Sequence, residues 1–261
     1  MKRLILIQTD YAGAGKTTLA QCFERYLNLH RVPHHSAVLT ESTDGNSARA
    51  QISIDELSTS TFLSHLQHAD LVLFEVETGL TDAFHNFYLK KELWTVLSEW
   101  GFEMTVVVPV TSEEESFDAV TLAAEIFSDS TQYLVAHTPT SSSYDDESSH
   151  WDRSHAARVM DMFEAVDMDM PAAHGGLEFQ LKTHHAELHT VIAGTDADPA
   201  LDAEVTKWFR KVGSQLDALK KYLFGDAFRP EIRVITPKEH SRKTRGRKPK
   251  SALMQALADA A

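Results

Sequence analysis

The stretch that decides the fold of this 261-residue chain runs Ile5-Leu6-Ile7-Gln8-Thr9-Asp10-Tyr11-Ala12-Gly13-Ala14-Gly15-Lys16-Thr17-Thr18. An apolar run enters a loop of small residues, and the loop closes on Gly-Lys-Thr-Thr. Apolar residues then recur at helical spacing as far as Leu27. A strand, a glycine-containing loop and a helix in this order predict a phosphate-binding loop.

The residue types of the loop suit a polyphosphate. Gly13 and Gly15 let the backbone come close to a phosphate and turn its N–H groups inward. The N-terminus of the following helix adds the positive end of its dipole. Lys16 would reach the terminal phosphates, and the Thr17 hydroxyl would hold Mg²⁺. The alternative is an ordinary strand-to-helix turn with an incidental lysine.

The loop resembles the deviant phosphate-binding loop of the ParA/MinD family of P-loop ATPases, roughly Lys-Gly-Gly-x-Gly-Lys-Thr-Thr. A standard Gly-x-x-x-x-Gly-Lys-Thr loop needs glycine where Asp10 stands. Tyr11 replaces the signature lysine, which in that family crosses a dimer interface to the partner's nucleotide, so the resemblance implies slow hydrolysis. The residues implied to hold ATP or ADP are Ala12, Gly13, Ala14, Gly15, Lys16, Thr17 and Thr18.

An acidic segment, Leu39-Thr40-Glu41-Ser42-Thr43-Asp44-Gly45-Asn46-Ser47, follows the second predicted strand. In the family, carboxylates at this position orient the attacking water and Mg²⁺. The resemblance implies that catalytic role for Asp44, with Glu41 as the alternative because a small slip in the alignment exchanges them. Asp-Gly and Gly-Asn are also common turn pairs, so an Asx-type turn is the other interpretation.

A second acid ends the apolar run Asp70-Leu71-Val72-Leu73-Phe74-Glu75. A carboxylate at such a strand end lies across from a phosphate-binding loop and holds Mg²⁺ through water. Glu75 is therefore predicted to share Mg²⁺ with Thr17, although family members usually have aspartate there. Gly79 is expected to approach the terminal phosphate.

Pro171 closes the segment Val166-Asp167-Met168-Asp169-Met170-Pro171. The resemblance implies a strand here, whose following loop contacts the nucleotide base through Pro171. A helix end with a breaker is the rival interpretation. Thr138 stands where many family members have a base-reading asparagine.

Strand and helix patterns alternate along most of the chain, which predicts an α/β fold: a P-loop NTPase with a mainly parallel, doubly wound sheet flanked by helices. The predicted domains are 1–235, which binds nucleotide, and 236–261, a basic linker and tail with a short terminal helix. The predicted strands are Lys2–Gln8, Ala37–Thr40, Leu71–Glu75, Met104–Pro109, Gln132–Ala136 and Glu231–Ile235. The predicted helices are Thr17–Leu29, Asp55–His68, Phe84–Trp100, Glu114–Phe127, Asp152–Ala165, Leu177–Ile192 and Asp198–Phe224.

Positive charge is concentrated in the flexible tail. The segment from Lys238 to Lys250 has seven basic residues against Glu239, so it carries +6 while the rest of the −13 chain carries −19. An acidic body repels DNA and a basic tail attracts it. The tail resembles an AT-hook, an element that lies in the minor groove of A·T-rich DNA; a generic basic tail is the alternative. The DNA-contacting residues are then Arg242, Lys243, Arg245, Gly246, Arg247, Lys248 and Lys250.

Composition limits the compartment and the class of protein. Cys22 is the only cysteine, which excludes a disulfide framework and favours a reducing cytoplasm. The sequence has no apolar run of about 18 residues that would span a membrane, and its first residues lead directly into a strand, without a signal-peptide pattern.

The resemblance implies a cytoplasmic, Mg²⁺-dependent ATPase that acts in the segregation, stability or transfer of a DNA element, as in the plasmid partition and StbB- and TraL-like conjugal-transfer branch. ATP would promote a homodimer or binding to a partner such as a DNA-binding adaptor protein. Two other classes remain open. One is a small-molecule kinase or ligase with a P-loop fold, and the other is a non-hydrolysing DNA-binding adaptor, which Tyr11 and Glu75 favour.

Overall fold

The computed structural model describes residues 1–43, 49–139, 147–178 and 199–230. The chain divides into two compact units, Met1–Glu231 and Ile232–Ala261, and the second lies outside the described residues. The strands are β1 Lys2–Ile7, β2 His35–Thr40, β3 Ala50–Ser53, β4 Leu71–Val76, β5 Phe102–Val110, β6 Gln132–His137 and β7 Val166–Asp169. The helices are α1 Lys16–Leu29, α2 Thr59–Leu66, α3 Thr81–Lys90, α4 Leu93–Glu99, α5 Asp118–Phe127, α6 Glu147–Arg153, α7 His155–Met162 and α10 Pro199–Phe224. Short 3₁₀ helices are η1 Ile54–Glu56, η2 Glu114–Phe117, η3 Ser128–Ser130 and η4 Gly225–Ala227.

The seven described strands form one parallel sheet in the order β3-β2-β4-β1-β5-β6-β7. β1 lies near its centre, with Ile5 in register with Leu73 of β4 on one side and Thr105 of β5 on the other. Both flanking pairs are parallel, so the carboxyl ends of β1, β4 and β5 lie at the same edge of the sheet. The predicted fold class, a parallel doubly wound P-loop sheet flanked by helices, is confirmed.

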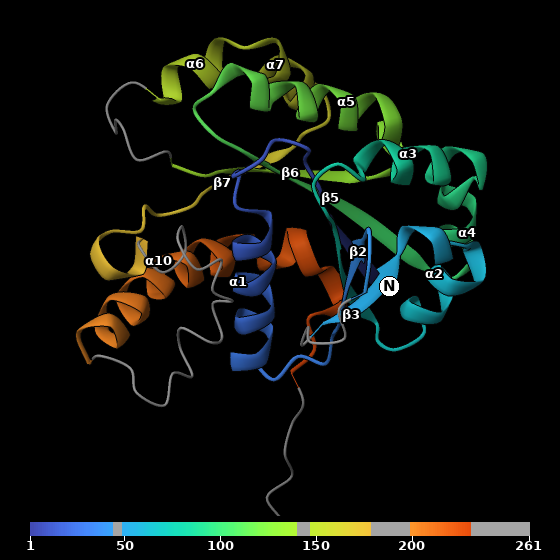
Figure 1. The fold of residues 1–261 in the computed structure, drawn as a ribbon, viewed down its shortest axis with the longest axis horizontal. Coiled ribbons are helices and arrows are strands. Elements are labelled where there is room, and N and C mark those ends of the chain that lie inside the picture. Colours follow the sequence, from blue (N-terminus) through green and yellow to red (C-terminus); the bar gives the residue numbers. More distant parts are fainter. Residues whose placement is uncertain (44–48, 140–146, 179–198, 231–261) are drawn as a thin grey trace, which may run out of the picture. The chain divides into compact units, whose positions relative to one another are not determined.

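Alternate side chains of β1 pack into two separate hydrophobic cores, one on each face of the sheet, because successive residues of a strand point to opposite faces. Leu4 and Leu6 pack into the core formed with α2, α3, α4, α5 and α7. Ile5 and Ile7 pack into the opposite core, formed with α1 and α10. Figure 1 shows these two helical layers on either side of the sheet. The unbroken apolar run of β1 is the sequence signature of a strand covered on both faces.

The structure corrects three details of the sequence-based assignment. β3 was missed, because four residues are too few to show a strand periodicity. The helix predicted over Phe84–Trp100 is two helices, since Glu92 adopts φ +48° between α3 and α4. The helix predicted over Asp152–Ala165 is likewise two helices, α6 and α7. Of the two interpretations of Val166–Pro171, the strand is the one observed, over Val166–Asp169. The strand predicted at Glu231–Ile235, and all but the first two residues of the helix predicted at Leu177–Ile192, lie outside the described residues.

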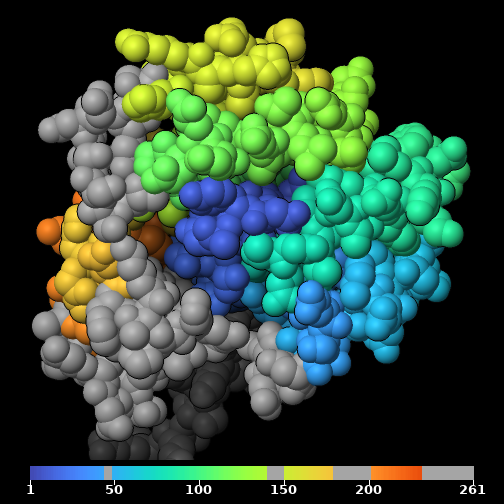
Figure 2. Space-filling model, turned by 45° about the horizontal axis from the view of Figure 1, so that its top comes forward, coloured from blue at the N-terminus to red at the C-terminus, as the bar shows by residue number. Residues whose placement is uncertain are grey.

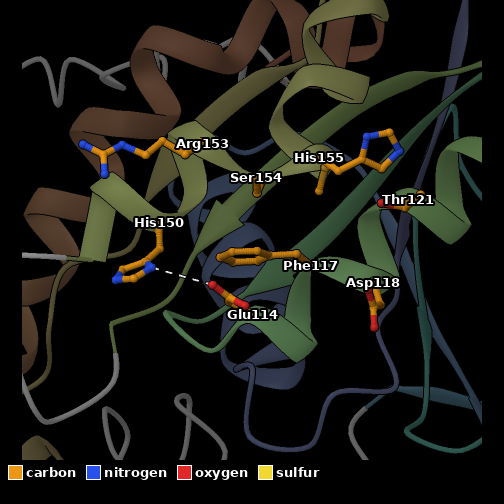
Figure 3. A pocket seen from close by; sticks show the side chains of 9 residues that line it. Glu114, Phe117, Asp118, Thr121, His150, Arg153, Ser154 and His155 are labelled. Atoms are coloured by element: carbon orange, nitrogen blue, oxygen red, sulfur yellow. Dashed lines mark ion pairs between the residues drawn. The ribbon is translucent and has the colours of Figure 1, made fainter.

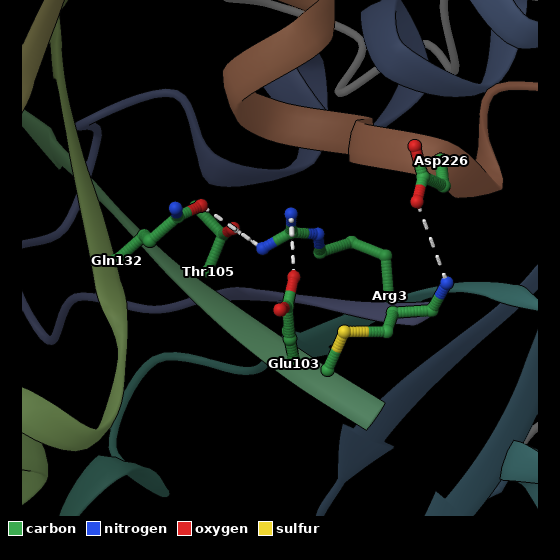
Figure 4. A network of polar contacts seen from close by, with 6 residues as sticks. Arg3, Glu103, Thr105, Gln132 and Asp226 are labelled. Carbon is green, nitrogen blue, oxygen red and sulfur yellow. Dashed lines mark hydrogen bonds and ion pairs between the residues drawn. The ribbon is translucent and has the colours of Figure 1, made fainter. Parts of the chain in front are cut away.

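A buried arginine ties β1 to its neighbours at the amino end of the sheet (Figure 4). The Arg3 guanidinium is 3.0 Å from the Glu103 carboxylate and donates hydrogen bonds to Thr105 Oγ1 at 3.4 Å and to Gln132 Oε1 at 2.9 Å. Burial lowers the pKa of Arg3, and the nearby Glu103 charge opposes that shift. These contacts hold the guanidinium in place against the backbone of Gly225.

Gly225→Ala should destabilise the fold by about 2 kcal/mol. Gly225 has φ +50°, and an added Cβ would lie 2.6 Å from Arg3 Nη2, an atom that is already held by Glu103. Gly213→Ala is the control: this helical glycine has no neighbouring atom within 4 Å of an added Cβ, so the change should be neutral or stabilise by up to about 1 kcal/mol. Urea unfolding of both variants measures the difference, and equal stabilities would contradict this description of Gly225.

Candidate functional site

The loop between β1 and α1 has the backbone shape that phosphate binding requires. Gly13 has φ +81° and Gly15 has φ +82°, a region that side chains other than glycine rarely adopt. Gly15 is the N-cap of α1, and no side chain caps that end of the helix. A glycine N-cap supplies no capping side chain to the first amide groups of α1, as at an anion-binding helix N-terminus. In the space-filling view the β1–α1 segment is exposed between the α3 and α5 regions (Figure 2).

Lys16 lies folded over this loop. Its ammonium group donates to the Thr9 carbonyl and to Thr78 Oγ1, the latter at 2.8 Å. The residue is only 7% exposed, and burial lowers the pKa of Lys16, while the carboxylates of Glu75, Asp10 and Glu77 oppose that shift. The positive charge is thus held beside the loop by hydrogen bonds that a polyphosphate could replace.

Thr17 and Glu75, the two residues predicted to share Mg²⁺, lie in direct contact. The Thr17 hydroxyl donates to Glu75 Oε1 at 2.7 Å. Glu75 is the penultimate residue of β4 and stands in register with Ile7 of β1, which explains why a strand end brings its carboxylate to the loop. The other oxygen of Glu75, Oε2, accepts from the Arg49 guanidinium.

These oxygen atoms fit a magnesium ion in type and placement. A hydroxyl and a carboxylate are the hard ligands that Mg²⁺ prefers, and the ion usually takes its remaining ligands from phosphates and water. Within the described residues, no group of three or more His, Cys, Asp or Glu side chains is arranged to hold a metal. Thr17 and Glu75 would therefore hold Mg²⁺ together with the phosphates of a nucleotide rather than alone.

Asp10 connects the loop to the segment after β4. Its Oδ1 accepts hydrogen bonds from the Gly79 amide at 2.9 Å and from the Thr81 hydroxyl at 2.6 Å. Gly79 has φ +89°, and Thr81 begins α3. The amide expected to approach a terminal phosphate is therefore bound by a carboxylate. Asp10, which stands where a standard loop has glycine, thus fixes the loop to the start of α3.

Glu77 connects the same segment to the end of β2. Its Oε2 accepts from Thr40 Oγ1 at 2.7 Å and from the backbone N–H of Glu41 at 3.2 Å. Glu41, one of the two candidates for the catalytic acid, is exposed at this strand end. Asp44, the other candidate, lies outside the described residues.

Thr138 and Pro171 were both expected near a nucleotide base. Thr138 contacts the loop itself: its hydroxyl donates to the Ala14 carbonyl at 2.9 Å, and its Cγ2 would be 3.3 Å from a Cβ at Gly15. Pro171 follows β7, and its carbonyl accepts from Trp208 Nε1 of α10 at 2.6 Å. Ala12, Gly13 and Thr17 are exposed, whereas Ala14 is buried and Thr18 is partly buried.

Sequence reasoning missed the contacts of Arg49, Asp10 and Glu77. Arg49 has no recognisable motif around it, and the short strand β3 that follows it was not predicted. Asp10 was noted only as a departure from the glycine pattern. Glu77 lies two residues after the predicted magnesium ligand, and a second acid at a strand end is the one signal that could have indicated it.

A separate hollow of about 410 Å³ lies between η2 and α5 on one side and α6 and α7 on the other (Figure 3). Charged side chains of both signs surround Phe117 there, and His150 Nδ1 is 3.7 Å from Glu114 Oε1. None of its described lining residues comes from the β1–α1 loop. The β1–α1 loop and this hollow are therefore two distinct places on the molecule.

Two sequence-based expectations concern membranes and cysteine chemistry. None of the helices in the described part of the chain has the length and apolar character needed to cross a bilayer. Cys22 is fully buried in α1, and burial raises the pKa of its thiol. Cys22 is therefore a packing residue of the core beside α1 and α10. The seven residues predicted to contact DNA lie outside the described residues.

Comparisons with known proteins give only distant matches. No family model matches the sequence, and no curated protein matches it. The solved structure of the MinD cell division protein of Aquifex aeolicus is similar with a TM-score of 0.42 and 16% identity, over 81% of this chain and 97% of that one. The MinC:MinD cell division protein complex of the same organism gives a TM-score of 0.41 and 12% identity, over 83% and 96%. Similarity at this level does not assign a family, so function has to be argued from the side chains.

Proposed function

We propose that this chain is a Mg²⁺-dependent, nucleotide-binding P-loop ATPase of the ParA/MinD type. The observation that carries the proposal is the Thr17–Glu75 hydrogen bond beside Lys16, at the mouth of a loop with two left-handed glycines. A lysine that can bind phosphate, a hydroxyl and a carboxylate that can bind a metal, and the N-terminus of a helix all lie at one edge of a parallel sheet. An incidental strand-to-helix turn has no reason to place a buried carboxylate on the hydroxyl of the residue after the lysine.

Each side chain has a defined task in this proposal. The amides of the loop and the Lys16 ammonium neutralise phosphate charge, which is the main requirement of phosphoryl transfer. Lys16 is held at the loop by Thr78 Oγ1 and the Thr9 carbonyl, so it exchanges those partners for phosphate oxygens. Thr17 and Glu75 would hold Mg²⁺, and the ion would supply positive charge that neutralises the phosphates.

The water-orienting acid is Asp44 in this proposal, with Glu41 as the alternative. Turnover is slow, because Tyr11 stands where the family has the lysine that reaches across a dimer. Asp10 supports the slow-turnover expectation, since its carboxylate already occupies the Gly79 amide. In this proposal Ala12, Ala14 and Thr18 complete the phosphate-binding loop, and Pro171 contacts the nucleotide base.

The biological task proposed is the segregation, stability or transfer of a DNA element in the cytoplasm, as in plasmid partition. The charge asymmetry supports it, because a +6 segment attached to a −19 body has a use in DNA contact and little use in a small-molecule enzyme. Nucleotide would promote a homodimer or the binding of an adaptor protein. A non-hydrolysing DNA-binding adaptor is the second candidate, which the pairing of Glu75 with Arg49 favours.

Turnover of ATP separates these functions. The wild type should hydrolyse ATP slowly and only with Mg²⁺, and Lys16→Ala should lower that rate at least tenfold with or without duplex DNA. Asp44→Ala should trap the ATP state, whereas loss of turnover in Glu41→Ala alone would assign the water-orienting role to Glu41. ATP binding without turnover in any condition would favour the adaptor.

A further inference from the structure

A buried arginine occupies the carboxylate that Mg²⁺ would share. The Arg49 guanidinium bonds Glu75 Oε2 through Nη1, and its Nε is 3.8 Å from Glu24 Oε1 of α1. The side chains of Arg49 and Glu75 are 12% and 4% exposed, so their attraction is weakly screened by solvent. The oxygen on the other side of the same carboxylate is the one that accepts from Thr17.

We infer that Arg49 is a resident cation at the magnesium position, and that it competes with Mg²⁺ for Glu75. This inference rests on the proposed nucleotide-binding function and deepens it by naming the residue that sets its Mg²⁺ requirement. A buried carboxylate needs a counter-charge, and the guanidinium supplies it when no divalent cation is bound. Mg²⁺ then has to replace a charge-assisted hydrogen bond rather than enter a vacant carboxylate.

Glu24 gives the displaced guanidinium a second carboxylate. Burial raises the pKa of Glu24, and the nearby Arg49 charge opposes that shift, so the two residues are electrostatically coupled. Glu24 of α1 and Glu75 of β4 therefore both interact with the same guanidinium, that of Arg49. Removing the charge of Arg49 and removing the charge of Glu24 should therefore move the Mg²⁺ requirement in opposite directions.

The test is a titration of each variant with fluorescent ADP at a series of MgCl₂ concentrations. Arg49→Gln should lower the half-saturating Mg²⁺ concentration about tenfold, a change of about 1.4 kcal/mol. Glu24→Gln should raise the half-saturating Mg²⁺ concentration roughly threefold, because Arg49 then loses its second carboxylate and binds Glu75 more strongly. Arg210→Gln removes an exposed arginine of α10 and should leave the value unchanged.

The two opposite shifts keep the test decisive even if one variant is too unstable to measure. Equal Mg²⁺ dependence in wild type, Arg49→Gln and Glu24→Gln, with ADP bound in all three, would overturn the role of Arg49 alone. Shifts of Arg49→Gln and Glu24→Gln in the same direction would also overturn it, since general damage to the site moves both alike. Absence of ADP binding by the wild type at every Mg²⁺ concentration would overturn the proposed function as well.

Discussion

Lys16→Ala should weaken the binding of MgADP or MgATP at least tenfold, a loss of about 1.4 kcal/mol. The Lys16 ammonium is buried beside the glycine loop, where its attraction for phosphate is less screened than at the surface. Its present partners, Thr78 Oγ1 and the Thr9 carbonyl, are neutral groups that a phosphate would replace with a stronger charge-assisted contact. Isothermal titration calorimetry measures the affinity directly.

Lys207→Ala is the matched control for that experiment. Lys207 is exposed on α10, outside the site, so its removal changes net charge by the same amount without touching the loop. The affinity of the Lys207→Ala variant for MgADP should equal that of the wild type. An equal loss of affinity in both variants would show that Lys16 acts only through the net charge of the protein. An unchanged affinity in Lys16→Ala would show that Lys16 does not bind the nucleotide.

Deletion of residues 238–261 should abolish DNA binding and leave nucleotide affinity intact. The deleted segment contains the +6 of residues 238–250 together with Asp259, a net charge of +5, so the remaining chain carries −18 and repels phosphates. Deletion of 251–261 alone is the matched control, because it keeps the basic segment and should keep DNA binding. Fluorescence anisotropy with labelled duplexes gives the affinities of all three proteins.

The salt dependence of the same binding reports how the tail contacts DNA. The logarithm of the association constant should fall by about 0.9 per neutralised phosphate for each tenfold increase in salt. A preference for A·T-rich duplex that is lost in Arg245→Ala, Arg247→Ala would support the AT-hook interpretation, and equal affinity for all duplexes would leave a generic polycation. Unimpaired binding by the 238–261 deletion would place the DNA contact on the acidic body.

The sequence was sufficient for the parts of the fold that follow from local pattern. The apolar runs at Ile5–Ile7 and Leu71–Phe74 predicted strands buried on both faces, and both lie at the centre of the sheet. Val166–Asp169 was also assigned as a possible strand. Thr17 and Glu75 were predicted to share Mg²⁺, from an acid at a strand end across from the loop, and the structure has the two side chains in hydrogen-bond contact.

The parts that could not be predicted depend on contacts between distant residues. Arg49 precedes β3, and β2 lies between β3 and the strand β4 that carries Glu75. No local sequence pattern identifies an arginine that will be buried against a distant carboxylate. Asp10 was visible only as a missing glycine, yet its bonds to Gly79 and Thr81 span about 70 residues of sequence. The break between α3 and α4 depends on a single left-handed residue, Glu92, in an otherwise helical pattern.

The central claim is that the loop between β1 and α1 binds nucleotide phosphates with Mg²⁺. The most direct test follows backbone amide chemical shifts by NMR while MgADP is titrated into the wild type. The largest shifts should fall on Gly13, Gly15, Lys16 and Thr17, with a second group at Gly79. Shifts confined to the hollow between α5 and α7, or no saturable shifts at all, would contradict the claim.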